Sequence, residues 1–245
     1  MPRKPTLLPP FLMLAALCCA HAAAARAQEQ VEMKPRPAAE ADALKAASLC
    51  EQARAHAAAG REGAGAAPAP FAQAVKLYLR IYQKERPPAP SAGPAALAAF
   101  RAQLREWLAG APRCVDDYLA LGLGTPFERA QLEAFRGQAQ MISETDESRT
   151  VLIANEMDTR ARILYKPHPG FTEEARRNDV RGRVRLRAVL AADGTVRHVL
   201  VLEGLPHGMT EECVAAARAI RFTPAVKNGR PASQFVVLEY NFNTH

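Results

Sequence analysis

Apolar and polar residues alternate along a stretch that begins at Arg183. Arginines fall on one side of a period of two as far as Arg187, and the residues on the other side are Val184, Leu186, Ala188 and Leu190. This alternation is typical of a strand with one buried face. Asp193-Gly194 follows, a pair suited to the positive φ angles of a tight turn, and a valine-rich stretch comes next. The pattern predicts a β-hairpin whose first strand has a cationic outer face.

A second alternating stretch, from Gln234 to Phe242, predicts a third strand. Between the hairpin and this strand, Thr210 is expected to cap a helix that runs to about Arg221, with two glutamates in its first turn. A shorter helix, capped by Thr172, is expected before the hairpin. The order helix, hairpin, helix, strand predicts a small α+β domain with a three-stranded antiparallel sheet.

The turn-forming and motif residues of this region, taken together and in order, resemble those of the C-terminal domain of TonB-type energy transducers. The residues that carry the resemblance are Pro167 to Phe171, Ala175-Arg176, Gly182, Val184, Leu186, Asp193-Gly194, Gly204 to Gly208, Phe222 to Ala225 and Asn228-Gly229. The resemblance spans about residues 160–243. It implies a protein of the cell envelope that takes part in transport. The simpler alternative is that these glycines and prolines only build the turns of a small fold.

The resemblance also implies a binding mode, in which the last strand accepts an extended peptide from an outer-membrane receptor. The residues permit this mode independently, because a third strand beside a closed hairpin lies at an edge of the sheet with unpaired backbone groups. The predicted partner-binding residues are Gln234, Phe235, Val236, Val237, Leu238, Glu239, Tyr240 and Asn241. Which of the two alternating rows meets the partner is left open by the sequence.

The N-terminus predicts secretion. Arg3 and Lys4 precede an uncharged stretch, and Ala25-Arg26-Ala27 is a small-x-small cleavage pattern, so cleavage is expected before Gln28. The mature protein would then be periplasmic. The alternative is an uncleaved segment that anchors the chain in the inner membrane. Prolines interrupt the stretch, and its apolar core falls short of the ~20 residues that a spanning helix needs, which favours cleavage.

The middle of the chain is rich in alanine and predicts an all-α region. Helices are expected from about Ala38 to Ala59, around Phe71 to Tyr82, from Pro94 to Leu108, and after a capping box at Thr125 to Glu128. The expected divisions are a signal peptide at 1–27, a helical region at 28–142, a linker at 143–160 that contains Val151 to Ile153, and the TonB-like domain at 161–245. No long proline-rich spacer precedes that domain, so a link to inner-membrane motor proteins follows from the resemblance alone.

Charge and chemistry narrow the remaining choices. The formal net charge is +7, and the arginine row is expected to be a solvated strand face, although lipid headgroups or peptidoglycan are other candidates for it. Secretion argues against nucleic acid as a partner. Cys50 and Cys114 are candidates for a disulfide, and Cys213 is expected to be a buried apolar residue. No metal-binding spacing and no enzyme motif occurs, so neither a cofactor nor catalysis is expected.

Two functions from different classes fit these observations. The first is an envelope protein whose C-terminal domain binds a receptor peptide by strand addition, in energy-dependent transport. The second is a periplasmic adaptor or structural protein that transduces no energy. In that case the helical region binds a partner and the C-terminal domain serves assembly, with a homodimer as one outcome.

Overall fold

A computed structural model describes residues 36–59, 67–143 and 156–243. The predicted signal segment and the apolar patch from Val151 to Ile153 lie outside these residues. The described residues divide into two compact units, one that includes Arg36 and Pro87–Phe100 and one that includes the described parts of 37–86 and 101–243. The second unit contains the whole of the predicted C-terminal domain and most of the helical region.

Five α-helices form the helical region among the described residues, which confirms its all-α character. They are α2 (Pro37–Ala58), α4 (Pro68–Lys84), α5 (Gly93–Leu108), α6 (Ala111–Ala120) and α7 (Pro126–Ser143), with a short 3₁₀ helix η1 (Pro90–Ala92) before α5. Prolines lie in the first turns of α4, α6 and α7, where a missing N–H costs no helical hydrogen bond. The sequence did not predict α6, a ten-residue helix with three buried side chains.

The start of α7 shows why its prediction was secure. Thr125 Oγ1 accepts a hydrogen bond from the Glu128 N–H at 3.2 Å, and Glu128 Oε2 accepts one from the Thr125 N–H at 2.8 Å. This reciprocal pair is the capping box that the sequence predicted. Hydrogen bonds from the backbone and the side chain of Thr125 lower the pKa of the exposed Glu128 carboxylate.

A disulfide joins α2 to α6. It links Cys50 to Cys114, whose Cα atoms are 5.9 Å apart, and Arg54 pairs with Asp117 at 2.6 Å between the same two helices. The side chains fully buried around α4, α6 and α7 are large and apolar, and they include Phe71, Tyr78, Ile81, Leu108, Val115 and Phe135. The helices are therefore held by a core as well as by a covalent crosslink.

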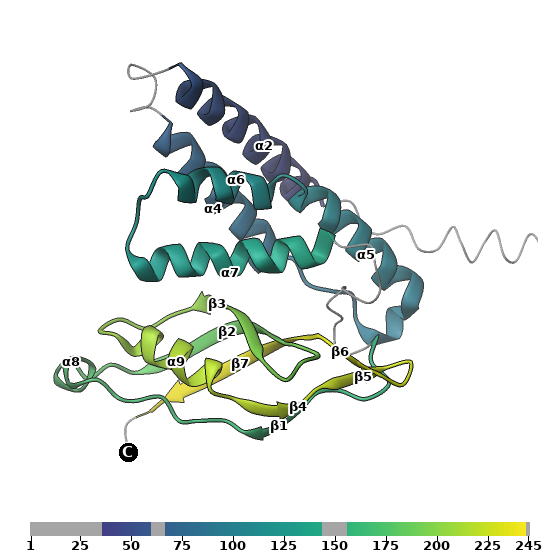
Figure 1. The fold of residues 1–245 in the computed structure, drawn as a ribbon, viewed down its shortest axis with the longest axis vertical. Coiled ribbons are helices and arrows are strands. Elements are labelled where there is room, and N and C mark those ends of the chain that lie inside the picture. Colours follow the sequence, from purple (N-terminus) through teal and green to yellow (C-terminus); the bar gives the residue numbers. More distant parts are fainter. Residues whose placement is uncertain (1–35, 60–66, 144–155, 244–245) are drawn as a thin grey trace, which may run out of the picture. The chain divides into compact units, whose positions relative to one another are not determined.

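The C-terminal domain is the predicted α+β unit. Its sheet is antiparallel and has the order β3-β2-β7, from β2 (Gly182–Leu190), β3 (Val196–Glu203) and β7 (Gln234–Phe242). Helix α9 (Met209–Arg218) lies across one face of this sheet, and the short α8 (Glu173–Arg177) precedes β2 (Figure 1). The buried stripe of α9 packs on the apolar side chains of β2, β3 and β7.

Four short strands complete the domain, and the sequence predicted none of them. β1 (Arg162–Tyr165) pairs with β4 (Arg221–Thr223), and β5 (Ala225–Lys227) pairs with β6 (Arg230–Ala232). The turn between β5 and β6 uses Asn228-Gly229 at φ angles of 50° and 70°. Positive φ at both residues is the requirement that made this pair a turn signal in the sequence.

Two details of α9 correct the sequence prediction. Thr210 does not cap the helix, because Gly208 occupies the cap position at φ +80° and Thr210 lies inside the first turn. Thr210 Oγ1 instead accepts from the Leu205 N–H at 2.8 Å and donates to the Leu205 C=O at 2.7 Å, which fixes the preceding loop. The helix ends at Arg218 and not at about Arg221, because Arg221 pairs within β4. The predicted cap of α8 is confirmed, since Thr172 accepts from the Ala175 N–H at 3.0 Å.

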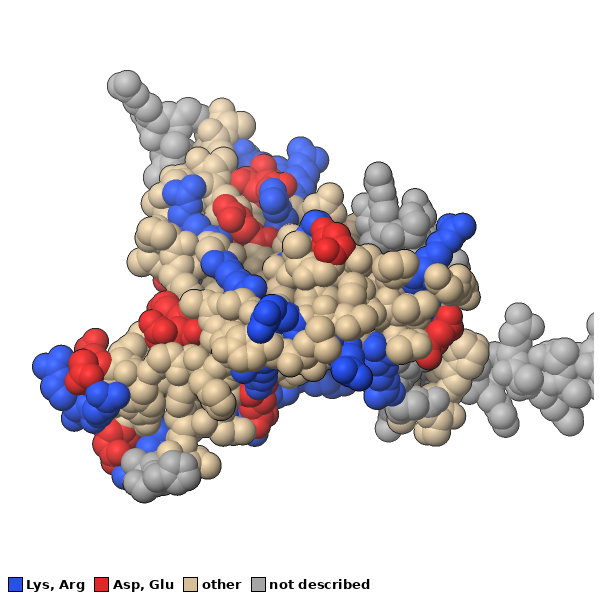
Figure 2. All heavy atoms as spheres, turned by 60° about the horizontal axis from the view of Figure 1, so that its bottom comes forward, with Lys and Arg blue, Asp and Glu red and all other residues tan. Residues whose placement is uncertain are grey.

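The arginine face of β2 is only partly solvated. Arg183 is exposed and pairs with Glu203 at 3.1 Å, as expected for a solvated strand face. Arg187 instead donates to the Tyr82 C=O of α4 at 3.1 Å, and its guanidinium lies 4.4 Å from the centroid of the Tyr82 ring. Basic and acidic side chains are interspersed on the face of the molecule drawn in Figure 2. None of the helices in the described ranges combines the length and apolar character that a membrane span requires.

Candidate functional site: the open edge of β7

Strand β7 lies at one edge of the three-stranded sheet. It pairs with β2 over nine residues without a register shift, from Leu190 opposite Gln234 to Gly182 opposite Phe242. No other strand of the described residues pairs with its outer side. The backbone groups on that side are therefore available for main-chain hydrogen bonds.

The contact of Lys166 identifies the outward row of backbone groups. Its Nζ donates to the Glu239 C=O at 2.6 Å, so this carbonyl faces away from β2. In an antiparallel ladder the N–H and C=O of one residue point to the same side, and the side alternates along the strand. The residues whose N–H and C=O face outward are therefore Phe235, Val237, Glu239 and Asn241.

The side chains of β7 alternate between a buried and an exposed face. Leu238 and Tyr240 belong to the core beneath the sheet, whereas 53% of Val237 is exposed and Glu239 and Asn241 are exposed as well. Gln234 is buried, and its Oε1 accepts from the Ala161 N–H at 2.8 Å. Three of the four residues whose backbone groups face outward, Val237, Glu239 and Asn241, therefore also have exposed side chains.

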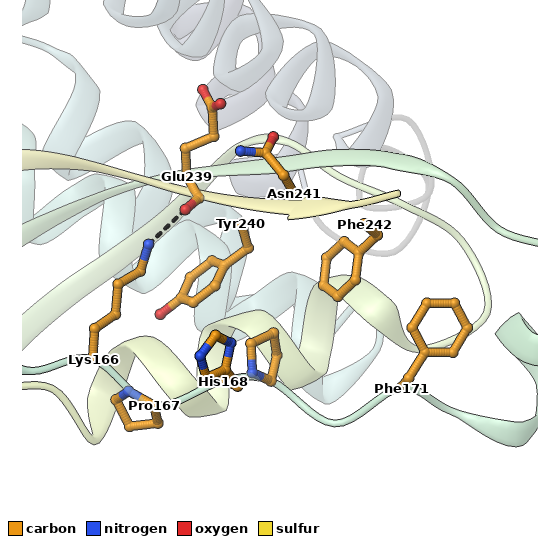
Figure 3. A pocket seen from close by; sticks show the side chains of 9 residues that line it. Lys166, Pro167, His168, Phe171, Glu239, Tyr240, Asn241 and Phe242 are labelled. Carbon is orange, nitrogen blue, oxygen red and sulfur yellow. Dashed lines mark hydrogen bonds between the residues drawn. The ribbon is translucent and has the colours of Figure 1, made fainter. Parts of the chain in front are cut away.

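A groove of about 330 Å³ runs beneath the C-terminal half of this edge (Figure 3). Its lower wall is the chain from Lys166 to Phe171, and Tyr240 and Phe242 point down into it, whereas Glu239 and Asn241 point up and away. Phe171 and Phe242 make an edge-on contact with ring centroids 5.8 Å apart. The groove is thus aromatic on two sides and carries one cation, the Lys166 ammonium.

The electrostatics of the groove keep its aromatic wall neutral. Lys166 Nζ lies 4.2 Å from the centroid of the Tyr240 ring. The Tyr240 hydroxyl is buried and has no hydrogen-bond partner among the described residues. Burial first, and then the neighbouring Cys213, raise the pKa of Tyr240 to about 12. Burial and the nearby Glu212 likewise raise the pKa of Cys213 to about 12, so this thiol stays protonated and behaves as an apolar residue.

All eight residues predicted to bind a partner lie on β7, and their role in binding stays a prediction. The structure shows which row of backbone groups faces away from β2, and it adds the groove that the sequence missed. The one signal for the groove was the segment Pro167-His168-Pro169-Gly170, which cannot be helical and must run extended or turn. Within the described ranges, no three histidine, cysteine or acidic side chains gather closely enough to hold a metal ion.

The C-terminal part of the chain is similar to a known protein family. Residues 167–244 match the family described as Gram-negative bacterial TonB protein C-terminal. The solution NMR structure of the Pseudomonas aeruginosa TonB C-terminal domain is 24% identical, and the match covers 38% of this chain and 93% of that chain with a TM-score of 0.31. A search of curated proteins found no match. Domains of this family generally interact with outer-membrane receptors, are typically non-enzymatic and suggest a place in the cell envelope.

Proposed function

Because residues 167–244 form a TonB C-terminal domain, we propose that this chain is an envelope protein whose last strand binds an extended peptide of an outer-membrane receptor. The observation that carries the proposal is the unpaired outer side of β7, with its outward N–H and C=O groups. A peptide that adds there gains main-chain hydrogen bonds along the strand, and its alternate side chains meet the groove.

Binding by strand addition requires one local change at the edge. The Glu239 C=O is occupied by the Lys166 ammonium, so an arriving N–H must take that acceptor and Lys166 must turn away. The remaining outward groups belong to Phe235, Val237 and Asn241. The aromatic side chains of Tyr240 and Phe242 then line the space beneath the added strand.

The sharpest test replaces Val237 with proline. Val237→Pro removes an outward N–H, whereas Val237→Ala shortens the same side chain and keeps that N–H. Because proline is tolerated on an edge strand when its missing donor faces outward, both variants should fold. Calorimetric titration of a candidate receptor peptide should show binding to the alanine variant and none to the proline variant. Equal binding by the two variants would exclude pairing at β7.

Energy-dependent transport is the wider function that we propose for this binding. It requires that the C-terminal domain reach the periplasm, which the predicted signal segment at residues 1–27 supplies, with periplasmic residence after cleavage. Direct coupling to inner-membrane motor proteins requires instead that this segment stay in the membrane.

A second candidate is a periplasmic adaptor that transduces no energy. The packing of α7 and α4 against the C-terminal sheet favours it, because the helical region is then part of one assembly surface. The fate of residues 1–27 separates the two candidates. A mature chain that begins at Gln28 and washes off membranes would exclude direct motor coupling. A chain that keeps the segment and crosslinks to motor proteins would exclude the adaptor.

A further inference from the structure

The other edge of the sheet, β3, is covered by a helix of the same chain. Gln131 of α7 donates from Nε2 to the Val199 C=O at 3.3 Å, and its Oε1 accepts from the Val201 N–H at 2.7 Å. One side-chain amide therefore satisfies the acceptor and the donor that a neighbouring strand would satisfy. Helix α7 lies along β3 in Figure 1.

A bulge in β3 provides a second anchor for α7. Arg187 pairs with Leu200 and Val189 pairs with Arg197, so β3 has one residue more than β2 in this interval. Gln138 enters there, and its Nε2 donates to the Arg187 C=O at 3.0 Å and to the His198 C=O. Its Oε1 accepts from the Tyr82 hydroxyl, and the side chain is fully buried. The buried amide satisfies carbonyls that the bulge leaves without a ladder partner.

The helix approaches the bulge closely because position 137 is glycine. A Cβ atom at Gly137 would lie 2.2 Å from the His198 ring, which no side chain tolerates without movement. Gly137 costs helix stability relative to alanine, so its presence in the middle of α7 is consistent with a contact requirement. Gln131, Gly137 and Gln138 together fit α7 to β3.

We propose that α7 is a substitute strand that keeps β3 closed, and that a second copy of this chain is the partner that the uncovered edge fits. The Val199 C=O and the Val201 N–H face outward, since both bond to Gln131. A two-fold axis at Leu200 sets Val199 of one copy opposite Val201 of the other, where the two residues exchange main-chain hydrogen bonds. Register shifts of β3 on both sides of this segment confine the regular pairing to Val199 through Val201.

This inference goes beyond the proposed function, because it assigns a role to the helical region and needs no receptor peptide. Of the two edges of the three-stranded sheet, β7 has no strand partner among the described residues, and β3 is covered by α7. Docking of α7 thereby prevents two copies of the chain from pairing through β3.

The test compares amide exchange and mass in solution. In the wild-type chain the Val201 amide should exchange more slowly than the outward Val237 amide. In Gln131→Ala the Val201 amide should exchange about tenfold faster, the factor that corresponds to about 1.4 kcal/mol, and sedimentation should show a concentration-dependent dimer. Gln140→Ala is the matched control, because Gln140 lies on the exposed face of the same helix. It should behave as the wild type does.

A second variant, Gly137→Ala, tests the uncovering of β3 without changing Gln131. Gly137→Ala places a methyl group against His198 while favouring the helix itself, so it should also uncover β3 and give the dimer. The proposal is overturned if Val201 exchanges as fast as Val237 in the wild type, if Gln131→Ala leaves the exchange rate of Val201 unchanged, or if the Gln131→Ala chain stays monomeric.

Discussion

His198 has an unusual backbone and an unusual environment for a histidine. Its φ of +48° falls in the left-handed region, where asparagine and glycine are the usual residues, and its imidazole lies against Gly137. Burial, followed by the positive charges of Arg197 and Arg136, lowers its pKa below the ordinary value of 6.5. The packing of α7 on β3 therefore favours the neutral imidazole, because protonation would add a positive charge near Arg197 and Arg136.

This lowered pKa predicts the direction of one pH effect. The unfolded chain binds a proton at His198 more readily than the folded chain, so the contribution of His198 to stability is complete above pH 6.5 and declines as the pH falls toward the folded pKa. His198→Asn keeps a residue that accepts positive φ and removes the titration. Urea unfolding at about pH 7.5 and about pH 5 should show a smaller loss of stability on acidification in His198→Asn than in the wild type.

The exposed His168 provides the control for this experiment. His168→Asn also removes one histidine, but from the rim of the groove, so its loss of stability between the two pH values should equal that of the wild type. An equal loss of stability in the wild type and in His198→Asn would show that folding does not change the pKa of the His198 imidazole.

At the scale of elements, the disulfide between α2 and α6 makes a testable contribution to stability. Cys50 and Cys114 are 64 residues apart in sequence, and closing a loop of this size in the unfolded chain stabilises the fold by about 2–4 kcal/mol. The double variant Cys50→Ser/Cys114→Ser should lose that amount in urea unfolding. Reductant should destabilise the wild type to a similar degree and leave the double variant unchanged. A double variant as stable as the oxidised wild type would contradict the prediction.

The elements that the sequence predicted are those with local signals. The strands β2, β3 and β7 follow from alternation bounded by Asp193-Gly194 and Asn228-Gly229, and α7 follows from its capping box. β1 escaped prediction because all four of its residues are exposed, so no alternation marks a buried face. The bulge in β3 escaped it because a histidine, rather than the usual glycine, occupies the left-handed position.

At the scale of the molecule, the edge position of β7 was predictable but its surroundings were not. Strand order follows from a closed hairpin and a returning third strand. The outward row depends on Lys166, which meets Glu239 across 73 residues of sequence, and the docking of α7 depends on Gln138, 49 residues from Arg187. No local pattern encodes such contacts. The arginine row was therefore expected to be solvated along its length, and Arg187 departs from that expectation because Tyr82 packs on it.

The contact between Arg187 of β2 and Tyr82 of α4 predicts that the helical region and the C-terminal sheet unfold together. Trp107, the one tryptophan of the chain, is buried in α5 and reports on the helices. Arg187→Met removes the hydrogen bond and the cation–π contact to Tyr82, and it should lower the stability reported by Trp107 fluorescence by about 1–2 kcal/mol although the change lies in β2. Arg183→Met lies on the same face of the same strand, and the structure pairs Arg183 with the exposed Glu203. This variant should change the stability reported by Trp107 by less than about 0.5 kcal/mol.

Far-UV circular dichroism should give the same midpoint as Trp107 fluorescence in each variant, because two packed parts that share buried hydrogen bonds unfold in one transition. If Arg187→Met shifts the circular dichroism transition and leaves the Trp107 transition in place, the two parts are energetically independent.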